Sequence, residues 1–506
     1  MPRAVNYDPS VYPIAQHYSA LAVAACFAVL TALYFDHSPL SIVAAAALPL
    51  ALLISIQSPI LVCVLFVSIT FFRIHEAYPF LEPLKLPFAF GSLMFTSLAL
   101  QWLVMGRIVP FWMPELRYLV GLFVLITIGV IFAKNRQVAW NFYSDVYWKI
   151  VLVTFAVAWI TRTTDDFNKI SRILVLSGIA IAAVAIYNKT YGIGLVEGTR
   201  VTIARKPRRE ELVGEFDPLE SVSTLSDPND LALILLFPLA FAISSLVYRS
   251  GVINTVLGLT GTVTTTLAII FTQSRGGLLG ILAILGVMGL RTIKSRTVVI
   301  SLGVAAALGL AVAMGISSRV SGGAQEISES GIDDSSLGRI IAWRAAIAMA
   351  VARPLNGVGI NNFIDSYHFF SEVPNRREKA VHSTWFQVLA ETGFPGFIVF
   401  VTMLVITFKT AIVTLMRLSI AQAPPILTAT ALSLVAGLAS FCAAGTFLTQ
   451  AFTLPIYILI GLTVALSRAS ERHHNNQSLD DVSVPWHPTP PLRPIYRHLP
   501  TFGRQK

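Results

Sequence analysis

The stretch ILTATALSLVAGLASFCAA, residues 426–444, decides the fold class because it holds no charged side chain over nearly the ~20 residues that cross a bilayer as a helix. Similar apolar blocks occur at residues 41–56, 88–105, 117–132 and 297–316. Their apolar residues are continuous rather than alternating, which favours helices over the strands of a barrel. The sequence therefore predicts an all-α, polytopic transmembrane helical bundle of about 12–14 spans.

Composition supports a membrane protein and argues against a nucleic-acid partner. Of the 506 residues, 55% are hydrophobic and only 13% are charged, whereas soluble chains carry about 25% charged residues. The net charge of +10 arises largely from short loops on one side and from the C-terminal segment, as the positive-inside rule predicts. The three cysteines, Cys26, Cys63 and Cys442, lie in apolar blocks and form no disulfide or metal-ligand pattern. The first apolar block lacks a small-residue cleavage site and is expected to remain as a span.

The distribution of basic residues predicts the topology. A cytoplasmic N-terminus places on the inner side Arg107, Arg117, Arg162, Lys169, Arg172, Arg249, Arg291, Lys294, Arg296 and Arg417. The expected segments are a cytoplasmic N-terminus (1–18), an N-terminal transmembrane bundle (19–187), a first long extracytoplasmic loop (188–229), transmembrane helices with an SRGG motif (230–316), a second long extracytoplasmic loop (317–382), C-terminal transmembrane helices (383–467) and a disordered cytoplasmic tail (468–506). In the second loop, residues 337–351 predict an amphipathic helix with Arg339 and Arg344 on its polar side.

The SRGG motif, residues 274–277, is expected at the outer start of an inward-running helix. Ser274 is a suitable N-cap, and free N–H groups with the positive end of the helix dipole favour an anion. The guanidinium of Arg275 beside Gly276 predicts a site for phosphate or diphosphate. The alternative is an arginine that reaches the lipid headgroups.

His382 is expected just outside the next inward-running helix, which Ser383 or Thr384 can cap. A histidine there can act as a general base near neutral pH, although for a lone histidine a headgroup-level residue without a role is the favoured interpretation. Glu391 lies nine residues deeper, where a carboxylate is costly and usually faces a partner or a cavity. Its neighbours Gly393, Pro395 and Gly396 are expected to disturb the helix, and an ion pair with Lys149 is an alternative explanation of Glu391.

A third helix start is expected at residues 227–230, DPND, where Asn229 and the flanking acids suit a structural cap more than a catalytic carboxylate pair. The three motifs share one face of the membrane. Their dipole ends, arginines and histidine could therefore converge on one anionic group.

Four segments in this order resemble the O-antigen ligase and polysaccharide polymerase superfamily of bacterial membrane glycosyltransferases. They are DPNDLAL, SRGG, GRIIAWRAAIAMAVARPLNGVGINNF and HSTWFQVLAETGFPG, and the resemblance runs from about residue 200 to residue 396. Two N-terminal segments, FFRIHEAYPFLEPL and YWKIVLVTFAVAWITR, resemble an O-glycosylation ligase subgroup.

The resemblance implies an inverting transfer at the periplasmic face of the bacterial inner membrane. The donor would be a glycan on undecaprenyl diphosphate, and the acceptor a glycan, lipid A-core or a protein. Two sizeable outer segments give room for two glycans, which favours a polymerase over a ligase. No cofactor and no metal are expected, because Asp333 and Asp334 suit an acidic turn better than a cation site.

The resemblance also implies residue roles. Arg275 would hold the diphosphate leaving group and His382 would deprotonate the acceptor hydroxyl. Arg200 fits a second catalytic arginine by its context GTRVTIA, but a charged insertion separates it from Asp227, so a nearby arginine could take its place: Arg205, Arg208 or Arg209. The residues expected to bind substrate are Ser274, Gly276, Asn229, Arg339, Arg344 and Glu391.

Two other classes of function compete with this prediction. A transporter of small anions or bicarbonate would place ionisable groups near the bilayer midplane, whereas most here are expected at outer helix ends. A membrane scaffold whose arginines bind anionic lipid is the other possibility, and neither alternative explains the ordered motifs.

Overall fold

The computed structural model describes residues 54–71, 86–191, 228–305, 308–309, 334–371 and 380–480. These ranges form helices, turns and connections without a β-strand. Within them, ten helices are long and apolar enough to cross a membrane, and Arg296–Ala305 is a shorter apolar helix. The predicted all-α polytopic bundle is therefore confirmed. Most of the block predicted at residues 41–56 lies outside the described residues.

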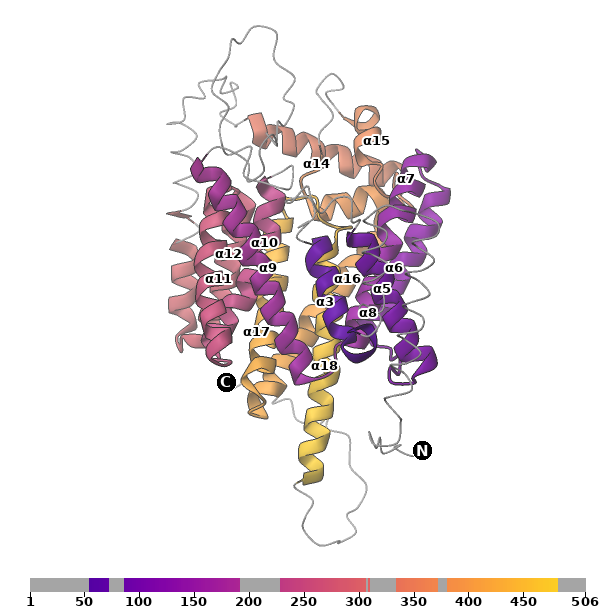
Figure 1. The fold of residues 1–506 in the computed structure, drawn as a ribbon. Helices are drawn as coiled ribbons and strands as arrows, with labels where there is room; N and C mark the ends of the chain where they lie inside the picture. Colours follow the sequence, from indigo (N-terminus) through magenta and orange to yellow (C-terminus); the bar gives the residue numbers. More distant parts are fainter. Residues whose placement is uncertain are drawn as a thin grey trace, which may run out of the picture.

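The bundle is built from two runs of helices (Figure 1). The first run is α3 (Pro59–Phe71), α5 (Leu86–Ala99), η2 (Leu100–Val104), α6 (Pro114–Ile131), α7 (Arg136–Phe142), η3 (Tyr143–Tyr147), α8 (Trp148–Ile160) and α9 (Thr164–Tyr191). The second run is α10 (Pro228–Val247), α11 (Val252–Phe271), α12 (Arg275–Thr292), α14 (Asp334–Ala352), α15 (Phe363–Phe370), α16 (Thr384–Ile420), α17 (Pro425–Gly445) and α18 (Leu454–Asp480). Helices α14 and α15 lie across one end of the bundle, the upper end in Figure 1, which is called the α14 end below.

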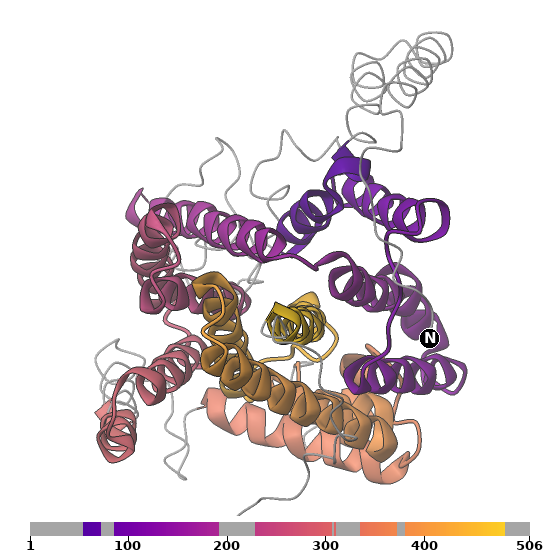
Figure 2. The same cartoon turned by 90° about the horizontal axis from the view of Figure 1, so that it is seen from below.

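Helix α18 occupies the centre of the bundle. Seen along the bundle, it is surrounded by the other helices (Figure 2), and it packs on α8, α16 and α17. Its apolar side chains are buried all round, including Ile456, Tyr457, Ile460 and Val464. A helix that is apolar on every side is suited to such a position, because each face meets another helix rather than water.

Helix α16 is divided by a break at Gly393. Its 37 residues would extend about 55 Å if straight, much further than the ~30 Å apolar core of a bilayer. Gly393 has φ 69° and ψ −170°, and a Cβ there would lie 2.5 Å from the Pro354 carbonyl oxygen. Residues 384–392 therefore form a short segment that packs beneath α14, while the remainder enters the bundle. The predicted disturbance of the helix at this position is confirmed.

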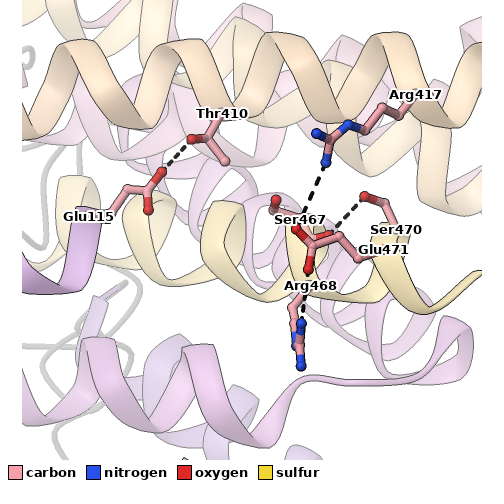
Figure 3. A network of polar contacts seen from close by, with 7 residues as sticks. All are labelled: Glu115, Thr410, Arg417, Ser467, Arg468, Ser470 and Glu471. Carbon is pink, nitrogen blue, oxygen red and sulfur yellow. Dashed lines mark hydrogen bonds and ion pairs between the residues drawn. The ribbon is translucent and has the colours of Figure 1, made fainter. Parts of the chain in front are cut away.

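Basic residues gather at the end opposite α14. Most of the cations that the sequence placed on the inner side lie in the connections or terminal turns after η2, α8, α10, α12 and α16, and Lys169 and Arg172 lie in the first half of α9. Figure 3 shows part of this end, where Glu471 contacts Arg468 at 3.0 Å and Arg417 at 3.9 Å. In the same view the buried Glu115 of α6 accepts a hydrogen bond from Thr410 of α16.

The C-terminal boundary of the bundle differs from the prediction. Residues 468–506 were expected to form a disordered tail, but α18 continues to Asp480. The pairing of Glu471 with Arg468 and Arg417 gives the first part of this extension a contact with α16. The polar composition that begins at residue 468 therefore does not coincide with the end of α18.

Candidate functional site at the α14 end

Helix α12 begins as the SRGG motif predicted. Ser274 is the N-cap, with extended backbone, and its hydroxyl accepts a hydrogen bond from the Gly277 N–H at 3.2 Å. Arg275, the first residue of the helix, is exposed. A Cβ on Gly277 would lie 2.7 Å from Ala232 Cβ, so a small residue is needed for α12 to approach α10 this closely. Gly276 faces the end of α17, where an added Cβ would lie 3.5 Å from the Ala444 carbonyl oxygen, an ordinary contact distance.

The start of α10 contacts the start of α12. Pro228 is the first residue of α10, as expected for a proline in a first turn. The next residue, Asn229, accepts a hydrogen bond through its side-chain oxygen from the Ser274 hydroxyl at 2.8 Å. Two of the three predicted helix starts are therefore joined side chain to side chain.

The connection between α17 and α18, residues 446–453, links the third helix start to the other two. The His382 N–H donates to the Thr449 hydroxyl at 2.9 Å. The Gln450 side-chain amide donates to Asp230 of α10 at 2.6 Å, and its backbone N–H donates to the Thr384 hydroxyl at 3.3 Å. The predicted convergence of α10, α12 and α16 at one end is therefore found in the structure, and residues 446–453 hold it together.

The sequence did not single out Gln450. The local sequence could have indicated it, since TFLTQAF, residues 446–452, places hydroxyl and amide side chains between two apolar helices on the predicted outer side. The partner Asp230 lies 220 residues away in the chain, so only the tertiary structure identifies it.

His382 is half-buried and has φ 46°. Non-glycine residues rarely adopt this left-handed conformation, and histidine does so more often than most. The conformation lets the chain turn into α16 with the His382 N–H directed at Thr449. Ser383 occupies the N-cap position, but its buried hydroxyl makes no capping hydrogen bond. The prediction that the Ser383 or Thr384 side chain caps α16 is therefore wrong, because Thr384 instead donates to the Leu448 carbonyl at 2.8 Å.

Glu391 has a structural partner that the sequence did not indicate. Its side chain is 3% exposed, and its two oxygens accept hydrogen bonds from the backbone N–H groups of Asn361 at 2.9 Å and Phe363 at 3.3 Å. The carboxylate thus holds the start of α15 against the short segment of α16. The suggested ion pair with Lys149 is wrong, and substrate binding by Glu391 is not needed to explain a buried carboxylate here.

Helix α14 confirms the predicted amphipathic helix and lies next to His382. Its buried face includes Ile341, Ala342, Ala345 and Met349. Trp343 donates its ring N–H to the Val381 carbonyl at 3.0 Å, and its ring stacks on Phe386 with the centroids 5.2 Å apart. Arg344 is exposed and Arg339 is partly exposed. Arg200, the other predicted catalytic arginine, lies outside the described residues.

The α14–α15 region is also fixed to the turn between α6 and α7. The Asn135 backbone N–H donates to the Asn362 side chain at 2.8 Å, and the Asn135 amide donates to Asp365 at 3.0 Å. Lys134 Nζ lies 3.0 Å from the centroid of the Phe369 ring. Partial burial and the nearby positive charge of Arg353 lower the pKa of Lys134. The region is thus held from two sides, by Glu391 and by this turn.

Comparison with known proteins supports the resemblance seen in the motifs. Residues 260–401 match the family model described as O-antigen ligase. The matched range contains Arg275, both α14 arginines and His382, but neither Asn229 nor Gln450. A search of curated proteins found no match to the chain. The match of residues 260–401 to the O-antigen ligase model thus supports, for this part of the chain, the resemblance to the O-antigen ligase and polysaccharide polymerase superfamily.

Proposed function

We propose that the chain transfers a glycan from undecaprenyl diphosphate to an acceptor hydroxyl at the periplasmic face of the bacterial inner membrane. The O-antigen ligase domain supports the general class of membrane glycosyltransferase. The observation that supports the specific reaction most is the meeting of the starts of α10, α12 and α16, linked through Asn229–Ser274 and Gln450–Asp230. An arginine and a histidine occur at the starts of two of these helices.

The proposed reaction is a single displacement. The acceptor oxygen forms a bond to the anomeric carbon while the bond from that carbon to the diphosphate breaks, and the diphosphate leaves with the electron pair. Attack opposite the leaving group inverts the anomeric configuration. His382 takes the proton of the acceptor hydroxyl. Arg275 and the positive end of the α12 dipole stabilise the charge that develops on the diphosphate.

Within this class we favour a polymerase, whose acceptor is another lipid-linked glycan. The long segments at residues 188–229 and 317–382 would give room for two glycans. An O-antigen ligase or a protein O-glycosylation ligase, which would use lipid A-core or protein as acceptor, is the alternative. Product length separates them, since a polymerase yields a ladder of products and a ligase a single addition to its acceptor.

The test is transfer of an undecaprenyl diphosphate-linked glycan by the purified full-length protein. We expect Arg275→Ala to lower kcat on the order of 10²–10³-fold, the typical cost of one preorganised donor at a developing charge. We expect His382→Ala to lower it on the order of 10²–10⁴-fold. Arg296→Ala is the matched control, because Arg296 is an exposed arginine at the opposite end, and it should retain wild-type activity.

The outcomes are distinct. Full activity in folded Arg275→Ala and His382→Ala proteins would show that the reaction occurs elsewhere. A wild-type protein that transfers no glycan with several donors and acceptors, while liposomes containing it take up small anions, would instead establish a transporter.

A further inference from the structure

Helix α14 carries apolar side chains on its exposed face as well as on its buried face. Ile340, Ile347 and Val351 recur at helical spacing and are 37%, 46% and 65% exposed, and Leu355, just after the helix, continues the row and is 70% exposed. Arg344 is the one charged side chain in this row. A helix that faces water normally exposes polar residues, so this row, called the α14 ridge below, is suited to an apolar environment.

The C-terminal end of the α14 ridge lies beside the ends of two membrane spans. The Arg353 guanidinium donates to the Phe132 carbonyl, at the end of α6, at 3.1 Å. The Pro354 carbonyl accepts from the Phe394 N–H, at the break in α16, at 2.9 Å. Because Leu355 directly follows Pro354, this end of the ridge is held close to both helices. In the view along the bundle, α14 lies at the rim next to α16 (Figure 2).

The length of α6 indicates the depth of this end in the membrane. Its 18 residues rise about 27 Å, slightly less than the ~30 Å apolar core of a bilayer, so the whole of α6 is needed to cross that core. A Cβ added to Gly129, in the last turn of α6, would lie 4.0 Å from the Asn356 carbonyl oxygen. The chain just after α14 therefore lies at the depth of the last turn of α6, at the edge of the hydrocarbon.

The α14 ridge also continues a surface that faces lipid. Helices α6 and α16 pack against each other, and both are candidate membrane spans. Near the contact with α14 they expose four large apolar side chains, namely Ile131, Phe132, Phe394 and Ile398. Exposed apolar side chains at the end of a span meet acyl chains. Leu355 and Val351 extend this surface from the two spans onto α14.

Basic and aromatic side chains lie where lipid headgroups are expected. Lys134 and Arg136, in the turn between α6 and α7, are exposed, as is Arg344 within the ridge. The Lys134 N–H donates to the Val358 carbonyl at 2.9 Å, which fixes this turn beside the end of α14. Trp140 of α7 is exposed, and tryptophan is enriched at membrane interfaces. Exposed cations at this level are complementary to the phosphates of anionic lipids.

We propose that α14 is an interfacial membrane helix, with its ridge immersed in the lipid leaflet on its own side of the bundle. Acyl chains contact Val351 and Leu355, and anionic headgroups contact Arg344 and the turn that holds Lys134. The helix is thus held between protein on one face and lipid on the other. Because Trp343 of α14 donates to the Val381 carbonyl, next to His382, the membrane surface would help to position the start of α16. The inference does not depend on the proposed reaction.

The test measures which solvent surrounds the ridge. Single cysteines are introduced as Val351→Cys and Leu355→Cys after Cys26, Cys63 and Cys442 are replaced by alanine, and are labelled with bimane. The full-length protein is placed in vesicles of phosphatidylethanolamine and phosphatidylglycerol. Gln137→Cys is the matched control, because Gln137 is an exposed polar residue of α7 at the same end.

We expect lipids with a nitroxide on the acyl chain to quench bimane at positions 351 and 355 at least twofold more than at position 137. Iodide in the aqueous phase should quench in the opposite order, again by at least twofold. Strong iodide quenching and weak nitroxide quenching at both ridge positions would place the ridge in water and overturn the proposal. Protection of both positions from both quenchers would overturn it as well, because a protein surface, such as a second copy of the chain, would then cover the ridge.

Discussion

The carboxylate of Glu391 illustrates how one buried group can organise a neighbouring loop. It accepts backbone hydrogen bonds from Asn361, in the connection between α14 and α15, and from Phe363, the first residue of α15. The same connection is hydrogen-bonded to Asn135 on its other side. Glu391 therefore acts on the candidate site through the position of α14 and α15. This places it among the residues that build the site, whether or not substrate touches it.

The first prediction concerns this residue. Glu391→Ala leaves the buried Phe363 N–H and the part-buried Asn361 N–H without acceptors, and we expect a local destabilisation of about 2–4 kcal/mol. Glu391→Gln keeps one acceptor oxygen and should lose roughly half as much. Hydrogen exchange of residues 358–366 measures the effect. A Glu391→Gln protein with normal exchange but no transfer activity would show instead that the carboxylate contacts substrate.

At the residue scale, the sequence predicted local geometry better than long-range partners. Ser274 as N-cap and Pro228 in a first turn follow from rules that involve only a few neighbouring residues, and both are found. The partners of Glu391 and Gln450 lie about 30 and 220 residues away. Such pairs depend on how helices pack, which a single sequence does not reveal.

At the scale of one element, the break in α16 determines how the α14 end is covered. The short segment of α16 carries Trp385 and Phe386, and Phe386 stacks on Trp343 of α14. The Phe394 N–H donates to the Pro354 carbonyl at 2.9 Å, so the break itself contacts the chain just after α14. An unbroken helix would remove both the short segment and this contact.

The second prediction tests the break. Gly393→Ala adds a Cβ where φ is +69° and where Pro354 O would be only 2.5 Å away, and we expect a loss of at least about 2–3 kcal/mol of stability. Gly286→Ala in α12 is the control, because no atom lies within 4 Å of its added Cβ, and it should be neutral or stabilising by up to about 1 kcal/mol. Thermal unfolding in detergent compares them. Equal midpoints for the two variants would contradict the interpretation of the break.

The length of an apolar block predicts a membrane-spanning helix, because lipid offers the backbone no hydrogen-bond partner and each long block must therefore be helical. The glycines and proline after Glu391 likewise predict the break in α16. The π turn η3 and the extension of α18 to Asp480 were not predicted. Both depend on contacts with other helices, such as Tyr147 against Tyr457 of α18 and Glu471 against Arg417 of α16.

At the scale of the whole molecule, the positions of the basic residues distinguish the two ends of the bundle. The cations named for the inner side lie opposite α14, while Arg275, His382 and α14 itself lie at the other end. The positive-inside rule therefore predicts that the α14 end faces away from the cytoplasm.

The third prediction tests this orientation in cells with single cysteines introduced after Cys26, Cys63 and Cys442 are replaced by alanine. Gln137→Cys, at the start of α7 at the α14 end, should react with a membrane-impermeant maleimide added outside. Ser295→Cys, in the turn after α12, should react only after the membrane is opened. The reverse labelling pattern would invert the topology and exclude a periplasmic site at the α14 end.

The central position of α18 has a consequence for biogenesis. The helices that it touches, α8, α16 and α17, all precede it in the chain. During synthesis they leave the translocon before α18, the helix around which they pack. The nascent bundle is therefore assembled without its central helix. Its inward surfaces are then covered by lipid or by a membrane chaperone until α18 arrives. A chain that stops before residue 454 would keep these surfaces open and become a substrate for membrane quality-control proteases.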